Sequence, residues 1–404
     1  MMKILCFTPI ILLSFVDITW AQLFNGVDSI NFALPFDDAD PYIDVYNKGD
    51  TLYLLNHTAG IFYTIDNTGS ICNKVSFQKI LDQKLSFWPI TVHVSSNYYL
   101  FSDGARFLLL DKSLKLYGFY WFQDTVHSYR SNTRWLPNSL FFNEKNHRIY
   151  FSTVTDYRDT DNHYLTSKYY LTPIIASFNV PSHRIKDSAS VLRIYSGKYL
   201  IARSPPYKYK YKFLPHLDFR NLYFDEKMNN IIISEAADSL VYIYDIEGHL
   251  VSSFGKESNN IKVEDSVRFI SNIQDRYKNI RGAFSWYLDS LFYTGVCYTA
   301  IKYFDSLDVF VREYIEPDTL KFISGNIANY NEYYLMSGSK IIRSNYLQIY
   351  LHKQLAADFR IPQKWKFIGI AKGNLLFYAL KKSRESDGYK VVIYFVPINK
   401  FIGK

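Results

Sequence analysis

The hydrophobic and polar positions between residues 214 and 255 follow the pattern of four short strands joined by tight turns. Apolar runs of β-branched and aromatic residues begin at Leu222, Ile231, Leu240 and Leu250, and short segments rich in Asp, Asn and Gly separate them. Such runs form strands, and such turns form hairpins. Four antiparallel strands in one unit are typical of a propeller blade.

The same spacing recurs elsewhere in the chain. In three places an Asp-led turn comes fourteen residues after the start of an apolar run: Asp66 after Leu52, Asp245 after Ile231, and Asp305 after Leu291. Self-similarity of this kind indicates a repeat fold, because each unit needs its neighbour to bury its apolar face. The alternative, a β-sandwich with meanders, is disfavoured by the length of 404 residues.

We predict an all-β fold, a β-propeller of four-stranded antiparallel blades. Seven units can be marked along the chain, at about 42–77, 88–121, 140–178, 214–255, 284–314, 322–351 and 367–396. Seven blades are therefore favoured, and six stay open if the weak unit 322–351 belongs partly to a neighbour. Residues 23–34 are expected to form a strand that completes the last blade and removes its open edge.

The N-terminus has the pattern of a secretory signal. A basic start at Lys3 precedes an apolar stretch over 4–16, and Ala21 offers a small residue for cleavage. We expect a signal peptide at 1–21, a single propeller domain at 22–404, and a periplasmic, secreted or cell-surface location. An uncleaved anchor is the alternative, but the apolar run is short for a bilayer, and no later stretch is long and apolar enough to cross one.

Composition adds further expectations. The 36 Tyr and 31 Phe suit stacked sheets. The net charge of +8 is mild and spread along the chain, so no nucleic-acid partner is expected. After signal cleavage only Cys72 and Cys297 remain, and two buried thiols are favoured over a disulfide between them. A monomer is expected.

An insertion in the third unit, at 153–172, carries the first group of candidate site residues. Four of its side chains could bind a metal ion or line a ligand site: Asp156, Asp159, Asp161 and His163. Long loops of this kind often carry function. A solvated loop is the favoured alternative.

A second candidate is the tract around residues 203–213, where aromatic and basic residues alternate. Period-two alternation predicts a strand with an aromatic face and a basic face, and the residues singled out as ligand-binding are Arg203, Tyr207, Lys208, Tyr209 and Lys210. Such a strand could hold an anionic or ring-shaped ligand. The alternative is an outer strand whose lysines prevent edge-to-edge pairing.

A third group, Asp37, Asp38, Asp40 and Asp44, could hold Ca²⁺. Their spacing matches no known calcium loop, so a solvated loop is favoured and no cofactor is expected.

The chain resembles the secreted β-propeller proteins of Bacteroidetes that are described as six-bladed or NHL-like. The resemblance rests on three stretches: 222–226 running into Ile231, the turn from Tyr242 to Gly248, and the matching segment from Phe62 to Gly69. It implies the fold and a cell-envelope location, and it carries over no functional residues. The third-unit insertion and the apparent seventh unit depart from that pattern.

Motifs of common enzyme classes are missing. The sequence has no G-x-S-x-G elbow, no phosphate-binding glycine loop and no H-E-x-x-H, and its nine His are scattered. We therefore expect a non-enzymatic binding or scaffolding module for a glycan or protein, with its site at one end of the central channel. The alternative is a polysaccharide lyase or glycoside hydrolase, which a channel pocket joining Tyr, His and Arg would favour.

Overall fold

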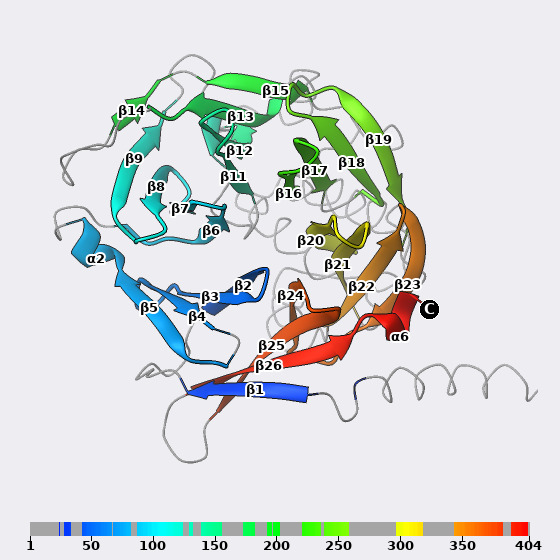
Figure 1. Cartoon of the computed structure of the whole chain (residues 1–404). Helices are drawn as coiled ribbons and strands as arrows, with labels where there is room; N and C mark the ends of the chain where they lie inside the picture. The colour runs from blue at the N-terminus through cyan, green and yellow to red at the C-terminus, as the bar shows by residue number, and fades with distance from the viewer. Residues whose placement is uncertain are drawn as a thin grey trace, which may run out of the picture.

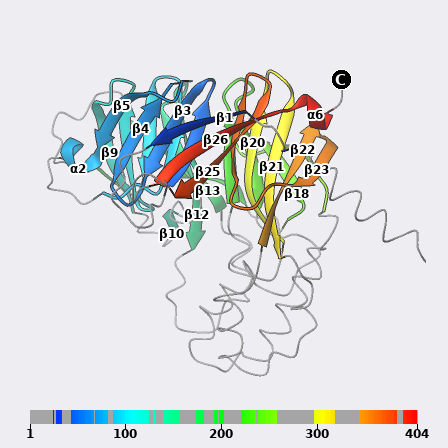
Figure 2. The same cartoon turned by 90° about the horizontal axis from the view of Figure 1, so that it is seen from below.

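The computed structural model describes residues 24, 28–33, 43–66, 68–81, 87–123, 129–131, 139–155, 173–181, 192–195, 197–202, 220–235, 238–257, 296–317, 343–382 and 389–402. Their strands form six sheets that stand as blades around a central axis (Figure 1). In the perpendicular view the strands run roughly along this axis (Figure 2). The predicted β-propeller is confirmed.

In the first three blades the strands follow one another from the axis outward. Blade 1 contains β2 (Ile43–Lys48), β3 (Thr51–Asn56), β4 (Ile61–Ile65) and β5 (Ile71–Ser76), followed by the short helix α2 (Phe77–Ile80). Blade 2 contains β6 (Thr91–Val94), β7 (Tyr98–Ser102), β8 (Arg106–Asp111) and β9 (Leu116–Phe122). Blade 3 contains β11 (Leu140–Asn143), β12 (Arg148–Thr155), β13 (Pro173–Asn179) and β15 (Lys198–Ala202), and β10 (Tyr129–Ser131) pairs with the end of β12.

The other three blades follow the same order. Blade 4 contains β16 (Arg220–Asp225), β17 (Asn230–Glu235), β18 (Leu240–Asp245) and β19 (Leu250–Gly255). Blade 5 contains β20 (Cys297–Phe304), β21 (Val309–Pro317), β22 (Arg343–Leu351) and β23 (Gln354–Arg360). Blade 6 contains β24 (Lys366–Ala371), β25 (Asn374–Lys382), β26 (Tyr389–Pro397) and β1 (Asp28–Ala33), and the helix α6 (Asn399–Ile402) follows β26.

The core lies between the blades. Six clusters of buried apolar side chains each combine residues from two neighbouring blades, one cluster at each junction of the ring. At the junction of blades 3 and 4, for example, the rings of Phe141 and Phe224 stack with centroids 4.4 Å apart. Because each sheet is apolar on both faces, no blade can shield its own surface, and closure of the ring supplies the missing contacts.

The N-terminal strand closes the ring, as the sequence predicted. β1 pairs antiparallel with β26, and Ile30 lies opposite Ile393. Ile30 also packs against the apolar cluster between blades 6 and 1. The outer edge of blade 6 is therefore covered by a segment from the other end of the chain (Figure 1).

The blade count is six, the option left open, rather than the favoured seven. The predicted units 284–314 and 322–351 share one blade, because β20 and β21 pair with β22 and β23 in a single sheet. Asp305 explains the difference. It begins the turn between the first two strands of blade 5, whereas Asp66 and Asp245 begin turns between third and fourth strands. The fourteen-residue spacing therefore matched two different positions within a blade.

One strand crosses between blades. β14 (Leu192–Ile194) follows β13 of blade 3, but it pairs in parallel with β9 at the outer edge of blade 2. The chain then returns to blade 3 as β15. The backbone N–H of Gln123 donates to the carbonyl of Ile194 at 2.9 Å, and the guanidinium of Arg193 lies over the ring of Trp121. Blades 2 and 3 are thus joined by backbone hydrogen bonds as well as by side-chain packing.

The cysteine prediction is wrong for Cys72. This residue lies on β5, the outer strand of blade 1, and its free thiol is exposed. The four residues from Ile71 to Lys74 are all exposed on this outer strand, so the cysteine among them is exposed as well. The side chain of Cys297 lies outside the described part of the structure.

Candidate functional site

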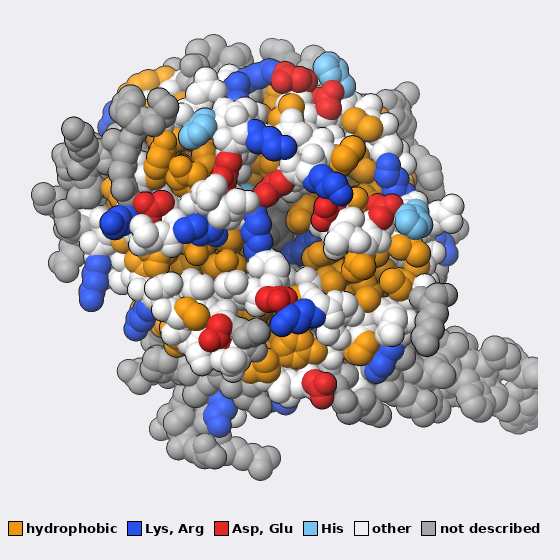
Figure 3. All heavy atoms as spheres, in the orientation of Figure 1, with side chains coloured by type: hydrophobic (Ala, Val, Ile, Leu, Met, Phe, Trp, Pro, Cys, Tyr) orange, Lys and Arg blue, Asp and Glu red, His pale blue; other side chains and the backbone are white. Residues whose placement is uncertain are grey.

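A cavity of about 740 Å³ occupies the central channel. The first strand of every blade contributes to its wall, with Lys48, His93, Phe141, Tyr223, Lys302 and Ile370 as one member from each of blades 1 to 6. It opens where the first strand of each blade turns into the second, and we call this end of the propeller the turn face. Figure 3 shows the opening as a hollow with basic and acidic side chains around it. Pockets of this size hold small ligands.

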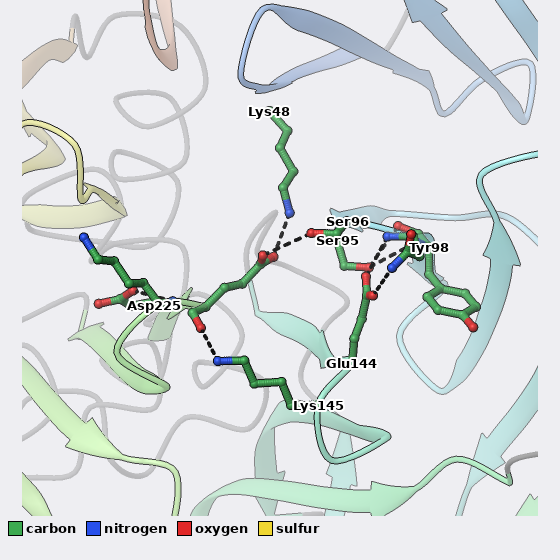
Figure 4. Close-up of polar contacts among 10 residues, drawn as sticks. Lys48, Ser95, Ser96, Tyr98, Glu144, Lys145 and Asp225 are labelled. Atoms are coloured by element: carbon green, nitrogen blue, oxygen red, sulfur yellow. Dashed lines mark hydrogen bonds and ion pairs between the residues drawn. The ribbon is translucent and has the colours of Figure 1, made fainter.

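The mouth of the cavity is crossed by an ion pair. Glu226, in the turn after β16 of blade 4, accepts a hydrogen bond from Lys48 Nζ at 2.7 Å (Figure 4). Lys48 ends β2 of blade 1, which lies opposite blade 4 in a ring of six. Ser96 Oγ, from blade 2, donates to the other carboxylate oxygen of Glu226 at 3.4 Å. Three blades therefore meet at one carboxylate.

Further polar contacts continue around the rim. Lys145 Nζ, from blade 3, donates to the backbone carbonyl of Glu226 at 3.1 Å. Glu144 accepts two hydrogen bonds from Asn97, from the backbone N–H and the side-chain amide, each at 2.7 Å (Figure 4). Burial alone would raise the pKa of Glu144, but the Asn97 hydrogen bonds and the nearby Lys48 hold it below its usual value. Glu144 is therefore a fixed carboxylate at neutral pH.

His93 lies in the wall, on β6 of blade 2. Its Nε2 is buried and makes no hydrogen bond to any described residue. Its ring meets Phe141 edge to face, with centroids 6.3 Å apart. Burial, with help from the nearby Lys48 and Lys112, lowers the pKa of His93 to about 3. The imidazole is therefore neutral at physiological pH, and its Nε2 is a buried polar atom without a partner among the described residues.

Lys302, on β20 of blade 5, lies in the opposite wall. Its Nζ donates to the backbone carbonyl of Ile368 in blade 6. Burial lowers the pKa of Lys302 to about 8, against the opposing influence of Glu313 and Asp44. At neutral pH the amine is still largely charged, and it gives the wall a positive group.

Two tyrosines supply the aromatic part of the wall between blades 4 and 5. Tyr303 stacks on Phe310 with centroids 4.3 Å apart, and its hydroxyl donates to Asp308 at 3.1 Å. Burial and Asp308 raise the pKa of Tyr303 to about 12. Burial, followed by the nearby Asp225, also raises the pKa of Tyr223. Both phenols are therefore protonated hydrogen-bonding groups rather than bases.

The constellation that would favour a lyase is only partly present. Tyr and His occur in the cavity wall, but the basic side chains among the described lining residues are Lys48, Lys145, Lys227 and Lys302, with no arginine. The wall is not filled by aliphatic side chains either.

The residues predicted to form the site lie outside the described part of the chain. These are Asp156, Asp159, Asp161 and His163 in the insertion, and Arg203, Tyr207, Lys208, Tyr209 and Lys210 in the alternating tract. The strands that lead into these segments, β12 and β15, both end at the face opposite the turn face. Any contribution of the nine residues stays a prediction.

The calcium hypothesis is also untested. Asp37, Asp38 and Asp40 lie outside the described residues, while Asp44 begins blade 1 and contacts His57 Nε2 at 3.0 Å. Within the described ranges, no group of three or more His, Cys, Asp or Glu side chains lies close enough to hold a metal ion.

Sequence reasoning missed the channel residues. Lys48 and Glu226 are 178 positions apart, and each stands beside an ordinary strand end. The one signal in the sequence was the position within the repeat. When the blades are aligned, Lys48 and Glu226 both lie next to the first turn of their blade. The charge on either residue gave no further information.

No family model matches the sequence, and no curated protein matches it. Among solved structures, the chain is similar to a member of the DUF4221 family from Bacteroides vulgatus, with 12% identity, a TM-score of 0.55, and coverage of 91% of this chain and 96% of that one. It is also similar to a putative exported protein from Bacteroides fragilis, with 10% identity, a TM-score of 0.48, and coverage of 92% and 95%. Identities this low show the fold alone. The resemblance to propellers of Bacteroidetes is confirmed at that level.

No helix among the described residues is long and apolar enough to cross a membrane.

Proposed function

We propose that this protein is a non-enzymatic binding module that takes a saccharide into the turn-face mouth of its central channel. The cavity carries the proposal. Its volume of about 740 Å³ falls in the range of small-ligand sites, and all six blades shape its wall. Ring faces at Tyr223 and Tyr303 suit the apolar faces of sugars, while the polar rim suits their hydroxyl groups.

The state of the tyrosines supports binding over proton abstraction. A tyrosine base needs a pKa near the working pH, whereas the pKa of Tyr303 is raised to about 12 and that of Tyr223 is raised as well. We assign no reaction to the site. Export to the periplasm or cell surface belongs to the proposal and rests on residues 1–21. The tract with Lys208 and Lys210 is kept as a second contact region.

Calorimetric titration of a library of neutral and acidic oligosaccharides tests the proposal. Tyr303→Leu is expected to weaken binding by about ten-fold, since it removes an aromatic face from the wall. Tyr195→Leu is the matched control, because Tyr195 is exposed beside β14 at the outer edge of blade 2. If no saccharide binds, or if both variants bind like the wild type, the proposed site is wrong. Lys208→Ala with Lys210→Ala tests the tract in the same assay.

A further inference from the structure

The carboxylate of Glu226 occupies the middle of the mouth, where a ligand would enter. It reaches there from the turn of blade 4 and meets Lys48 from the opposite blade. Ser96 of blade 2 supplies a second donor. A carboxylate in this position satisfies the donors that a ligand would otherwise meet first.

Glu226 is held less firmly than Glu144, the other carboxylate nearby. The side chains of Lys48 and Glu226 keep 35% and 42% of their surface exposed, and exposed ion pairs contribute little stability. Glu144, by contrast, is fixed by two hydrogen bonds of 2.7 Å from Asn97. The Glu226 carboxylate can therefore leave the mouth at small cost.

If the Glu226 carboxylate moved away, the charged groups left in the mouth would be mainly cationic. Lys48 and Lys145 reach Glu226 directly. The described lining residues also include Lys227 and Lys302, so four lysines stand against the three carboxylates of Asp225, Glu226 and Asp305. Without the Glu226 carboxylate, the mouth would attract an anion.

The remaining acidic groups of the rim are already engaged. Asp225 accepts hydrogen bonds from the backbone N–H groups of Lys227 and Met228 in its own turn. Asp305 pairs with Lys227 at 3.4 Å. These contacts are made within blades 4 and 5, so they do not neutralise the lysines of blades 1 to 3.

We infer that the ligand is an acidic saccharide, and that Glu226 occupies the place of its carboxylate until the ligand arrives. A uronate carboxylate would accept hydrogen bonds from Lys48 and Ser96, while its sugar ring would lie deeper in the cavity, near Tyr223 and Tyr303. This inference rests on the proposed function and narrows it to one class of saccharide.

The test compares a trisaccharide of galacturonic acid with the same trisaccharide after reduction of its carboxylates to primary alcohols. Both are titrated into the wild type, Glu226→Gln and Lys48→Met. Glu226→Gln is expected to bind the acidic sugar about three- to five-fold more tightly, because a competing charge is gone. Lys48→Met is expected to bind it more weakly. The gain should disappear in about 1 M NaCl, where the screening length is about 3 Å.

Glu247→Gln is the matched control. Glu247 forms an exposed ion pair with Lys198 between blades 3 and 4, away from the cavity, so its loss should leave both affinities unchanged. Thermal unfolding checks that each variant is folded. If the reduced sugar binds but Glu226→Gln does not favour the acidic one, the inference is wrong and the binding site stands. If neither sugar nor any library member binds, the proposed function fails too.

Discussion

Arg312 Nε donates a hydrogen bond to Ser234 Oγ at 2.9 Å across the junction of blades 4 and 5. The Arg312 side chain is fully buried, and its guanidinium lies over the ring of Tyr298, 3.5 Å from the centroid. Its other N–H groups donate to backbone carbonyls at the end of blade 4, including that of Ser239 at 2.6 Å. One side chain thus donates to the backbone carbonyls of Asp238, Ser239 and Leu240, where the chain enters β18.

Arg312→Met should therefore destabilise the protein strongly. The methionine fills much of the space but leaves Ser234 Oγ and those part-buried carbonyls without the arginine donors, and we expect a loss of about 3–5 kcal/mol in the free energy of unfolding. Urea unfolding measures the loss. Arg360→Met, at an exposed arginine on β23, is the control and should change stability little. Equal stability of the two variants would contradict the assigned role.

Removal of β1 should open the ring. A chain that begins at residue 34 loses the strand that pairs with β26, and the Ile30 contact between blades 6 and 1 goes with it. We expect the melting temperature to fall by about 5 °C or more. The uncovered edge of β26 should also promote association, which size-exclusion chromatography would detect. A truncated chain that melts like the full one would show that closure by β1 is dispensable.

His93 should make the protein less stable in acid. Its pKa is lowered to about 3 in the fold, against 6.5 for an ordinary histidine. Between these values the unfolded chain takes up a proton that the folded chain does not, so stability falls as the pH drops from 6.5 toward 3, by at most about 1.4 kcal/mol per pH unit. Urea unfolding at several pH values should show a shallower dependence for His93→Gln. The exposed His249 offers the control substitution, and an unchanged slope in His93→Gln would refute the prediction.

Glu313 should act in the opposite direction at higher pH. Burial raises its pKa to about 7 despite the nearby Lys366 and Lys302, so the folded chain holds a proton that the unfolded chain has lost above pH 4.5. The contribution of the Glu313 carboxyl to the free energy of unfolding is therefore fully present below pH 4.5 and is lost as the pH rises to 7. Glu313→Gln should gain about 2–3 kcal/mol over the wild type between pH 5 and pH 9. A gain that does not depend on pH would argue against a buried, titrating carboxyl.

The repeat architecture could be predicted because it is local. The Asp-led turns are one example: Asp66 and Asp245 each accept hydrogen bonds from two backbone N–H groups that follow, all at 2.9 Å. Such contacts lie within five residues, so the spacing of residues along the chain records them. The apolar strands of blade 4 were located for the same reason.

The candidate site could not be predicted from the sequence, because it forms only when the six blades close into a ring. Lys48 meets Glu226 only after six blades have closed into a ring, and no local pattern marks either side chain. The crossing of β14 is similar, since three residues that follow blade 3 pair with blade 2. The favoured count of seven blades came from Asp305. Its turn lies between the first and second strands of blade 5, but the sequence pattern had been matched to the turn between third and fourth strands.

The pairing of β1 with β26 makes closure of the ring a long-range contact. Ile30 lies opposite Ile393, although 393 − 30 = 363 positions separate them along the chain. Contacts between such distant segments carry a large loop-closure entropy and slow folding. We therefore expect closure by β1, which completes the channel and its mouth, to be a slow step of folding.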